Sequence, residues 1–268
     1  MTTYTRRAQH SLSESVDALN PSESNNISRQ MHLQRYLWAS NILKLAEPKS
    51  ILDIACGRGY GSKVLSGRGS VLAVDICPET IDYAKNRYGN KGVNFILGDM
   101  ESEEFWRIFP EKSIDAIVSF ETIEHSDVPD GVLYHFHKVL SSGGLLFLSV
   151  PNGLVERTLK TGQLANPYHV SSYSPEELQY IVQNAGFRNI QIYGQGPVYG
   201  FAMGVLRKII PGEKSKDIQN ENDIHKQYVG LKKARDSLPD GLIHFLATPR
   251  KWMVKTSDAL VIKAEKLI

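Results

Sequence analysis

The stretch that decides the fold of this chain is Ile51-Leu-Asp-Ile-Ala-Cys-Gly-Arg-Gly-Tyr-Gly61. Residues Ile51–Ile54 predict a short, buried parallel strand that carries the carboxylate of Asp53 near its end. A glycine-rich turn follows, and a helix is expected to begin near Ser62. A strand that runs into a glycine-rich turn and a helix amino terminus forms a site for an anionic or nucleotide-like ligand. The stretch therefore predicts such a site.

Apolar runs and helical patterns alternate on both sides of this stretch. The expected strands are Ile51–Ile54, Val71–Asp75, Val93–Leu97, Ile114–Phe120, Leu145–Val150 and Asn189–Tyr193. The expected helices are Gln30–Glu47, Gly61–Ser66, Thr80–Arg87, Val132–Leu140 and Ser174–Ala185. Continuous apolar strands that alternate with helices predict an α/β fold, in which helices cover both faces of a mostly parallel sheet.

The two ends of the chain depart from this alternation. Residues 1–29 are polar and rich in Ser and Asn, which predicts a flexible amino-terminal arm. Residues 200–254 interrupt the pattern before a short apolar strand at Ala259–Ala264, so we interpret them as an insertion that acts as a lid or substrate cap. Residues 30–199 and 255–268 then form one domain. Within the insertion, residues 201–216 mix apolar and basic side chains, which suits a helix packed on the fold or a weak membrane-surface contact.

The composition of the 268 residues excludes several classes of protein. A net charge of +2 lacks the basic excess of a nucleic-acid binder, and no apolar run is long enough for a signal peptide or a membrane span. Cys56 and Cys77 follow neighbouring strands and are expected to be small buried residues in a reducing compartment. The sequence therefore predicts a cytoplasmic protein.

Acidic residues stand at the carboxyl ends of three predicted strands, where open α/β sheets bind ligands. Asp75 is placed to accept hydrogen bonds from the hydroxyls of a ribose, and Asp99 to meet an adenine amino group. The glycines run G-x-G-x-G instead of the dinucleotide-binding G-x-G-x-x-G, and Asp53 precedes them. An NAD(P)-dependent oxidoreductase is therefore the less favoured hypothesis.

Taken together, these motifs make the sequence resemble the class I S-adenosylmethionine-dependent methyltransferases. The matching segments are Leu52–Gly61, Val74–Ile81, Gly98–Met100, Asp115–His125, Val139–Leu145 and Ala185–Phe187. The resemblance implies a Rossmann-like, seven-stranded sheet whose last strand, Ala259–Ala264, runs antiparallel between the fifth and sixth strands. Within the family, the segments Phe120–His125 and Asn166–Val170 are similar to small-molecule and sugar O-methyltransferases of bacterial surface-polysaccharide pathways.

The resemblance also implies the residues that hold S-adenosyl-L-methionine. The glycines would let the backbone approach its methionine part, Asp75 and Ile76 would meet the ribose and adenine, and Phe120 would lie beside the sulfonium. The implied cofactor-binding residues are Asp53, Ala55, Gly57, Gly59, Tyr60, Gly61, Asp75, Ile76, Asp99, Met100 and Phe120. Arg35, on the first predicted helix, is added to this set, with a solvated surface arginine as the alternative interpretation.

Methyl transfer to an alcohol needs a base, since the hydroxyl must lose its proton. His125 and His169, which follow the fourth and fifth strands, are the candidate bases, and Glu121 is expected to assist. Each histidine can instead simply hold a loop. Glu124, His125 and Asp127 form an alternative metal cluster, but their spacing is not diagnostic, and no metal is predicted.

The sequence thus predicts a methyltransferase that acts on an oxygen of a small molecule or glycan precursor. Quinone, lipid and other small-molecule substrates, methylated on oxygen or nitrogen, stay open. A catalytically silent module that kept the cofactor pocket is the alternative from a different class. Nucleic acid is not an expected partner, because the charge balance is near neutral.

Overall fold

The computed structural model describes residues 3–20, 27–89, 92–156, 164, 166–196, 248–249, 251, 254 and 257–267. The helices are α1 (Thr3–Glu14), α2 (Ile27–Ala46), α3 (Tyr60–Leu65), α4 (Pro78–Tyr88), α5 (Glu103–Trp106), α6 (Pro129–Val139), α7 (Pro175–Asn184) and the 3-10 turn η1 (Ile123–His125). The strands are β1 (Ser50–Ile54), β2 (Ser70–Asp75), β3 (Val93–Leu97), β4 (Ile114–Phe120), β5 (Leu140–Pro151), β6 (Arg188–Gln195) and β7 (Ala259–Glu265).

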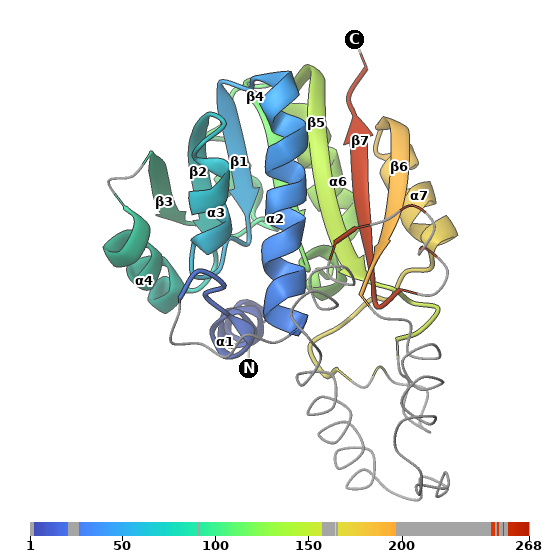
Figure 1. Cartoon of the computed structure of the whole chain (residues 1–268), viewed down its shortest axis with the longest axis horizontal. Coiled ribbons are helices and arrows are strands. Elements are labelled where there is room, and N and C mark those ends of the chain that lie inside the picture. The colour runs from blue at the N-terminus through green and yellow to red at the C-terminus, as the bar shows by residue number, and fades with distance from the viewer. Residues whose placement is uncertain are drawn as a thin grey trace, which may run out of the picture.

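The strands form one sheet in the order β3-β2-β1-β4-β5-β7-β6 (Figure 1). Neighbours from β3 to β5 pair in parallel, whereas β7 pairs antiparallel with both β5 and β6. This confirms the predicted α/β sheet and its antiparallel last strand. Because β1 to β4 are parallel, their carboxyl ends meet at one edge, which is the lower edge in Figure 1.

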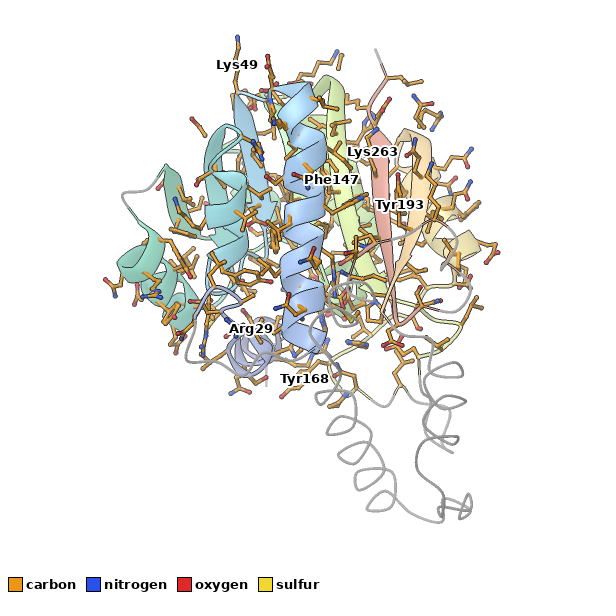
Figure 2. All side chains as sticks on the ribbon, in the orientation of Figure 1. Arg29, Lys49, Phe147, Tyr168, Tyr193 and Lys263 are labelled. Carbon is orange, nitrogen blue, oxygen red and sulfur yellow. The ribbon has the colours of Figure 1, made fainter. Side chains whose placement is uncertain are left out.

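Helices cover both faces of the sheet and divide the core into two layers. Apolar side chains of α2, α3 and α4 pack on one face, and those of α5, α6 and α7 pack on the other. Neighbouring residues of β1 illustrate the division, since Ile51 belongs to the first layer and Leu52 to the second. Trp38 of α2 meets Phe147 of β5 edge to face, and Figure 2 labels Phe147 behind that helix.

Two local features differ from the sequence-based expectations. Thr3–Glu14 forms helix α1, where a flexible arm was expected over residues 1–29. Strand β5 begins already at Leu140, before the glycines that were expected to close a helix. This early start is accommodated by a bulge opposite Ile114–Ala116 and by a left-handed Gly143, whose N–H donates to the Lys266 carbonyl. Residues 201–216 and nearly all of the 200–254 insertion lie outside the described part of the chain.

Candidate active site

A cavity of about 330 Å³ opens at the carboxyl ends of the parallel strands. Its walls come from the β1–α3 turn, the ends of β2, β3 and β4, the loop that follows β5, and helix α1. In Figure 2, Tyr168 marks this edge, whereas Lys49, just before β1, lies at the opposite edge. The cavity therefore occupies the place where open α/β sheets bind their ligands.

The turn after β1 is held against the end of β2 by one carboxylate. The backbone N–H of Gly57 donates to Asp75 Oδ2 at 2.8 Å, while Asp75 Oδ1 accepts from Cys77 N at 2.9 Å and Thr80 Oγ1 at 3.2 Å. Gly57 is left-handed, with φ +53°, and a Cβ built on it would meet no atom within 4 Å. The turn is thus open on that side, and the charge of Asp75 is fixed at the cavity wall.

Asp53 lies behind this wall and is fully buried. Its oxygens accept hydrogen bonds from Ser62 Oγ at 2.6 Å and Tyr36 Oη at 3.1 Å. Burial raises the pKa of Asp53 to about 7, against the opposing effect of these two hydrogen bonds. Asp53 therefore ties the end of β1 to α2 and α3.

The other two glycines of the turn serve packing. A Cβ on Gly59 would lie 2.6 Å from the Phe95 ring, and a Cβ on Gly61 would lie 2.2 Å from the Tyr36 ring. Glycine at these positions lets α3 approach β3 and α2 closely. Neither glycine lines the cavity.

Arg35 is buried beneath the site, neither solvated nor in the cavity wall. Its guanidinium contacts Glu121 Oε1 at 2.6 Å, Gln195 Oε1 at 2.6 Å and Ser149 Oγ at 2.8 Å. Burial favours the neutral form of Glu121, but the neighbouring guanidinium outweighs it and lowers the pKa of Glu121. Arg35 thus keeps a carboxylate ionised at the floor of the cavity, and its partners come from three distant segments.

The structure places the remaining predicted site residues along the cavity. Those that line it are Ala55, Gly57, Tyr60, Asp75, Ile76, Asp99, Met100, Phe120, Glu121, His125 and His169. Asp53, Gly59, Gly61 and Arg35 support the wall from behind. The sequence analysis missed His10 and His32, which also line the cavity.

His125 and His169 lie side by side, with ring centroids 4.8 Å apart. His125 Nδ1 lies 3.0 Å from the Tyr168 carbonyl oxygen, so this nitrogen carries the proton and Nε2 presents its lone pair. Burial lowers the pKa of His125 to about 4. His125 is therefore neutral at physiological pH, as a general base must be.

Helix α1 lies against the acidic residues of the cavity. Arg7 makes a two-pronged contact with Asp99, at 2.8 and 3.1 Å, and Ser11 Oγ donates to Asp75 Oδ1 at 2.7 Å. The signal in the sequence was the pair Arg6 and Arg7, whose charge complements acids that are more than 60 residues away. Polar groups of α1 therefore occupy the two carboxylates assigned to the ribose and the adenine.

These features fit S-adenosylmethionine as a ligand. Asp75 offers a fixed carboxylate beside an open glycine turn, and Ile76 and Met100 supply apolar surface next to Asp75 and Asp99. The hydroxyl of Ser11 and the guanidinium of Arg7 are donors of the kind that ribose hydroxyls and an adenine amino group would replace.

Comparison with known proteins identifies the family. The family model described as a methyltransferase domain matches residues 29–192. The chain belongs to this family. Probable S-adenosylmethionine-dependent methyltransferases of Mycobacterium tuberculosis are 28% identical over 149 residues, which is 54% of this chain and 51% of theirs. The predicted enzyme class and the cofactor S-adenosylmethionine are confirmed, while this chain spans about half the length of those curated relatives.

Other similar proteins carry more specific names. The malonyl-[acyl-carrier protein] O-methyltransferase of Anoxybacillus flavithermus is 30% identical over 105 residues, covering 38% of this methyltransferase chain and 39% of its own. A solved S-adenosylmethionine-dependent methyltransferase of Archaeoglobus fulgidus aligns with a TM-score of 0.55 at 18% identity and covers 88% of this chain and 94% of its own. The second likeness shows the fold alone. Within the described residues, no helix is both long and apolar enough to cross a bilayer.

Proposed function

We propose that this chain transfers a methyl group from S-adenosylmethionine to an oxygen atom of a small molecule or glycan precursor. The observation that carries the proposal is the neutral, oriented His125 at the cavity wall, next to His169 and across from the acidic residues that suit the cofactor. A hydroxyl acceptor needs such a proton acceptor, whereas a neutral amine does not need one before it attacks.

The cofactor supplies an electrophilic methyl group on a positively charged sulfur. Asp75 would bind its ribose hydroxyls, and Asp99 and Met100 would flank its adenine, once α1 has released both carboxylates. Phe120 and the ionised Glu121 would face the sulfonium, because both line the cavity at the end of β4. The protein then contributes mainly alignment of the acceptor oxygen with the methyl carbon.

The histidine pair would receive the acceptor hydroxyl. His125 Nε2 presents a lone pair into the cavity, while His169 Nδ1 contacts Glu156 and its Nε2 lies 2.9 Å from Asn166 Nδ2. Both nitrogens of His169 therefore already have partners within the loop after β5. The proposal accordingly assigns proton removal to His125 and acceptor positioning to His169.

An oxygen acceptor is also supported by the names of relatives. Besides the malonyl-[acyl-carrier protein] O-methyltransferase, a ubiquinone biosynthesis O-methyltransferase of Glaesserella parasuis is 27% identical over 108 residues, covering 39% of this chain and 46% of its own. A sugar hydroxyl of a surface-polysaccharide precursor is our first choice within this class, with residues 200–254 as its lid. Quinones and lipids are the alternatives. The free, buried Cys56 and Cys77 suit a cytoplasmic reaction.

The test is product formation with labelled cofactor. The chain would be incubated with methyl-labelled S-adenosylmethionine and fractionated cell extract, and labelled products would be identified by mass spectrometry. The proposal predicts a labelled small molecule or glycan precursor that forms with wild type but not with His125→Ala. Matched loss of a histidine outside the cavity, His135→Gln, is expected to leave product formation intact. Label only in protein or nucleic acid would contradict the proposal.

A further inference from the structure

One carboxylate in the cavity wall has no hydrogen-bond partner. Glu124 of η1 is 1% exposed, and neither of its carboxylate oxygens has such a partner among the described residues. Oε1 lies 3.8 Å from His125 Nε2, beyond hydrogen-bond distance. Burying a carboxylate in this way is costly unless a cation or donors compensate. The site therefore lacks a positively charged group beside Glu124.

Three potential ligands surround that position. One ligand atom each of Glu124, His125 and His169 lies within 4.8 Å of the other two. The backbone brings these residues together, because the Glu124 carbonyl accepts hydrogen bonds from Val170 N at 2.9 Å and Ser171 N at 3.1 Å. Those bonds fasten the loop that carries His169 to η1, so the cluster is built by the fold.

Both imidazoles are oriented as metal ligands usually are, with the other ring nitrogen held by an oxygen atom. His125 Nδ1 contacts the Tyr168 carbonyl, and His169 Nδ1 contacts the Glu156 carboxylate. The Nε2 lone pair of each ring is then left for a ligand.

Other groups now occupy these lone pairs. His10 Nε2 lies 3.0 Å from His125 Nε2, and Asn166 Nδ2 lies 2.9 Å from His169 Nε2. Because His125 accepts at Nε2, His10 is the donor of that bond. Both are single contacts from a side chain of α1 and a side chain of the loop after β5, and either side chain can rotate away.

We propose that Glu124, His125 and His169 bind a divalent transition-metal ion that activates the acceptor hydroxyl. Two imidazoles and one carboxylate suit Mn²⁺, Fe²⁺, Co²⁺ or Zn²⁺ better than Mg²⁺ or Ca²⁺, which prefer oxygen ligands. Asp127 is outside the site, because it is paired with Arg6 at 3.5 Å and is 45% exposed. The remaining coordination positions would face the cavity and admit water or the acceptor.

The catalytic part of this inference rests on the proposed O-methylation. The ion would draw electron density from the acceptor hydroxyl, whose proton passes to solvent, so His125 acts as a ligand and no longer as the base. The oxygen then forms a bond to the methyl carbon while the carbon–sulfur bond breaks and its electron pair stays on sulfur. The cofactor leaves as a neutral thioether, and atoms and charge balance.

The experiment titrates the chelator-treated full chain with Co²⁺, followed by visible absorption and by calorimetry. We expect one Co²⁺ per chain, displaced by Zn²⁺, and Mg²⁺ binding at least about tenfold weaker. Glu124→Gln and His169→Asn should each weaken Co²⁺ binding at least about tenfold. The control His135→Gln removes a histidine that contacts Glu103 at 3.0 Å elsewhere, and it should bind as wild type does.

Absence of Co²⁺ and Zn²⁺ binding by the wild-type chain would overturn the site, with no reference to any variant. Unchanged affinity in whichever of the two variants is folded by circular dichroism would overturn the ligand assignment. The catalytic role has its own test, in which product is measured with and without chelator. Methylation that survives chelation refutes the metal role and keeps the proposed function. Metal binding without any O-methylated product keeps the site and refutes the proposed function.

Discussion

Ser11 Oγ of α1 donates a 2.7 Å hydrogen bond to Asp75 Oδ1, so a hydroxyl of the protein lies where we place a hydroxyl of the cofactor. Arg7 holds Asp99 in the same way, at 2.8 Å. The amino-terminal helix is thus bound to both carboxylates that the cofactor needs, and it must release them before S-adenosylmethionine can bind.

The first prediction concerns this competition. The double variant Arg7→Ala, Ser11→Ala should bind S-adenosylmethionine up to about tenfold more tightly, because each lost hydrogen bond had a net worth of about 1 kcal/mol. Titration calorimetry measures the affinity. Ser13→Ala, at an exposed position of α1, is the matched control and should bind as wild type does. Weaker binding by the double variant would mean that these side chains hold the cofactor instead of competing with it.

The second prediction concerns the ribose. Asp75→Asn should weaken S-adenosylmethionine binding at least about tenfold, because a charged acceptor for two hydroxyls is replaced by a neutral amide. Asp82→Asn, at an exposed position of α4, removes a similar charge away from the cavity wall and should leave the affinity unchanged. Equal calorimetric affinities of the two variants would refute the ribose assignment.

The third prediction concerns pH and stability. The pKa of Asp53 is raised by burial to about 7, so between about pH 4 and 7 the folded chain keeps a proton that the unfolded chain has released. The contribution of Asp53 to the free energy of unfolding is therefore fully present below about pH 4 and declines as pH rises toward 7. Denaturant unfolding across this window should show a flatter profile for Asp53→Asn. Parallel profiles would place the titration elsewhere.

The fourth prediction concerns the glycine turn. Gly61→Ala should lower the free energy of unfolding by about 1–3 kcal/mol, because its Cβ would lie 2.2 Å from the Tyr36 ring. Gly131→Ala, at an exposed position of α6 where the nearest atom is 3.9 Å from the new Cβ, should instead raise stability by up to about 1 kcal/mol. Denaturant midpoints compare the two. A harmless Gly61→Ala would show that the α2–α3 contact is not tightly packed.

The sequence predicted the sheet well for a physical reason. Strands buried on both faces appear as continuous apolar runs, and the parallel arrangement then brings Asp75 and Asp99 to one edge. The glycine pattern also pointed to the correct turn. It did not reveal that Gly59 and Gly61 serve packing, since the rings of Phe95 and Tyr36 that fill the space come from other segments.

What the sequence could not reveal depends on distant partners. Helix α1 is polar, and its contacts with the cavity, such as Arg7 with Asp99, join residues 92 positions apart. The burial of Arg35 likewise depends on Glu121, Ser149 and Gln195, which meet only in the folded sheet. No local pattern marks such pairs, so an arginine on a helix suggested a surface or a ligand contact.

The central claim, methyl transfer to oxygen at the histidine pair, is tested most directly by locating the transferred carbon. The purified product formed with carbon-13-methyl S-adenosylmethionine would be examined by nuclear magnetic resonance, and its rate of formation compared between wild type, His125→Ala and His169→Ala. We predict a methyl group bonded to oxygen and rates lowered at least about a hundredfold in His125→Ala, with cofactor affinity unchanged. A methyl group on nitrogen or carbon, or a wild-type rate in both variants, would contradict the account.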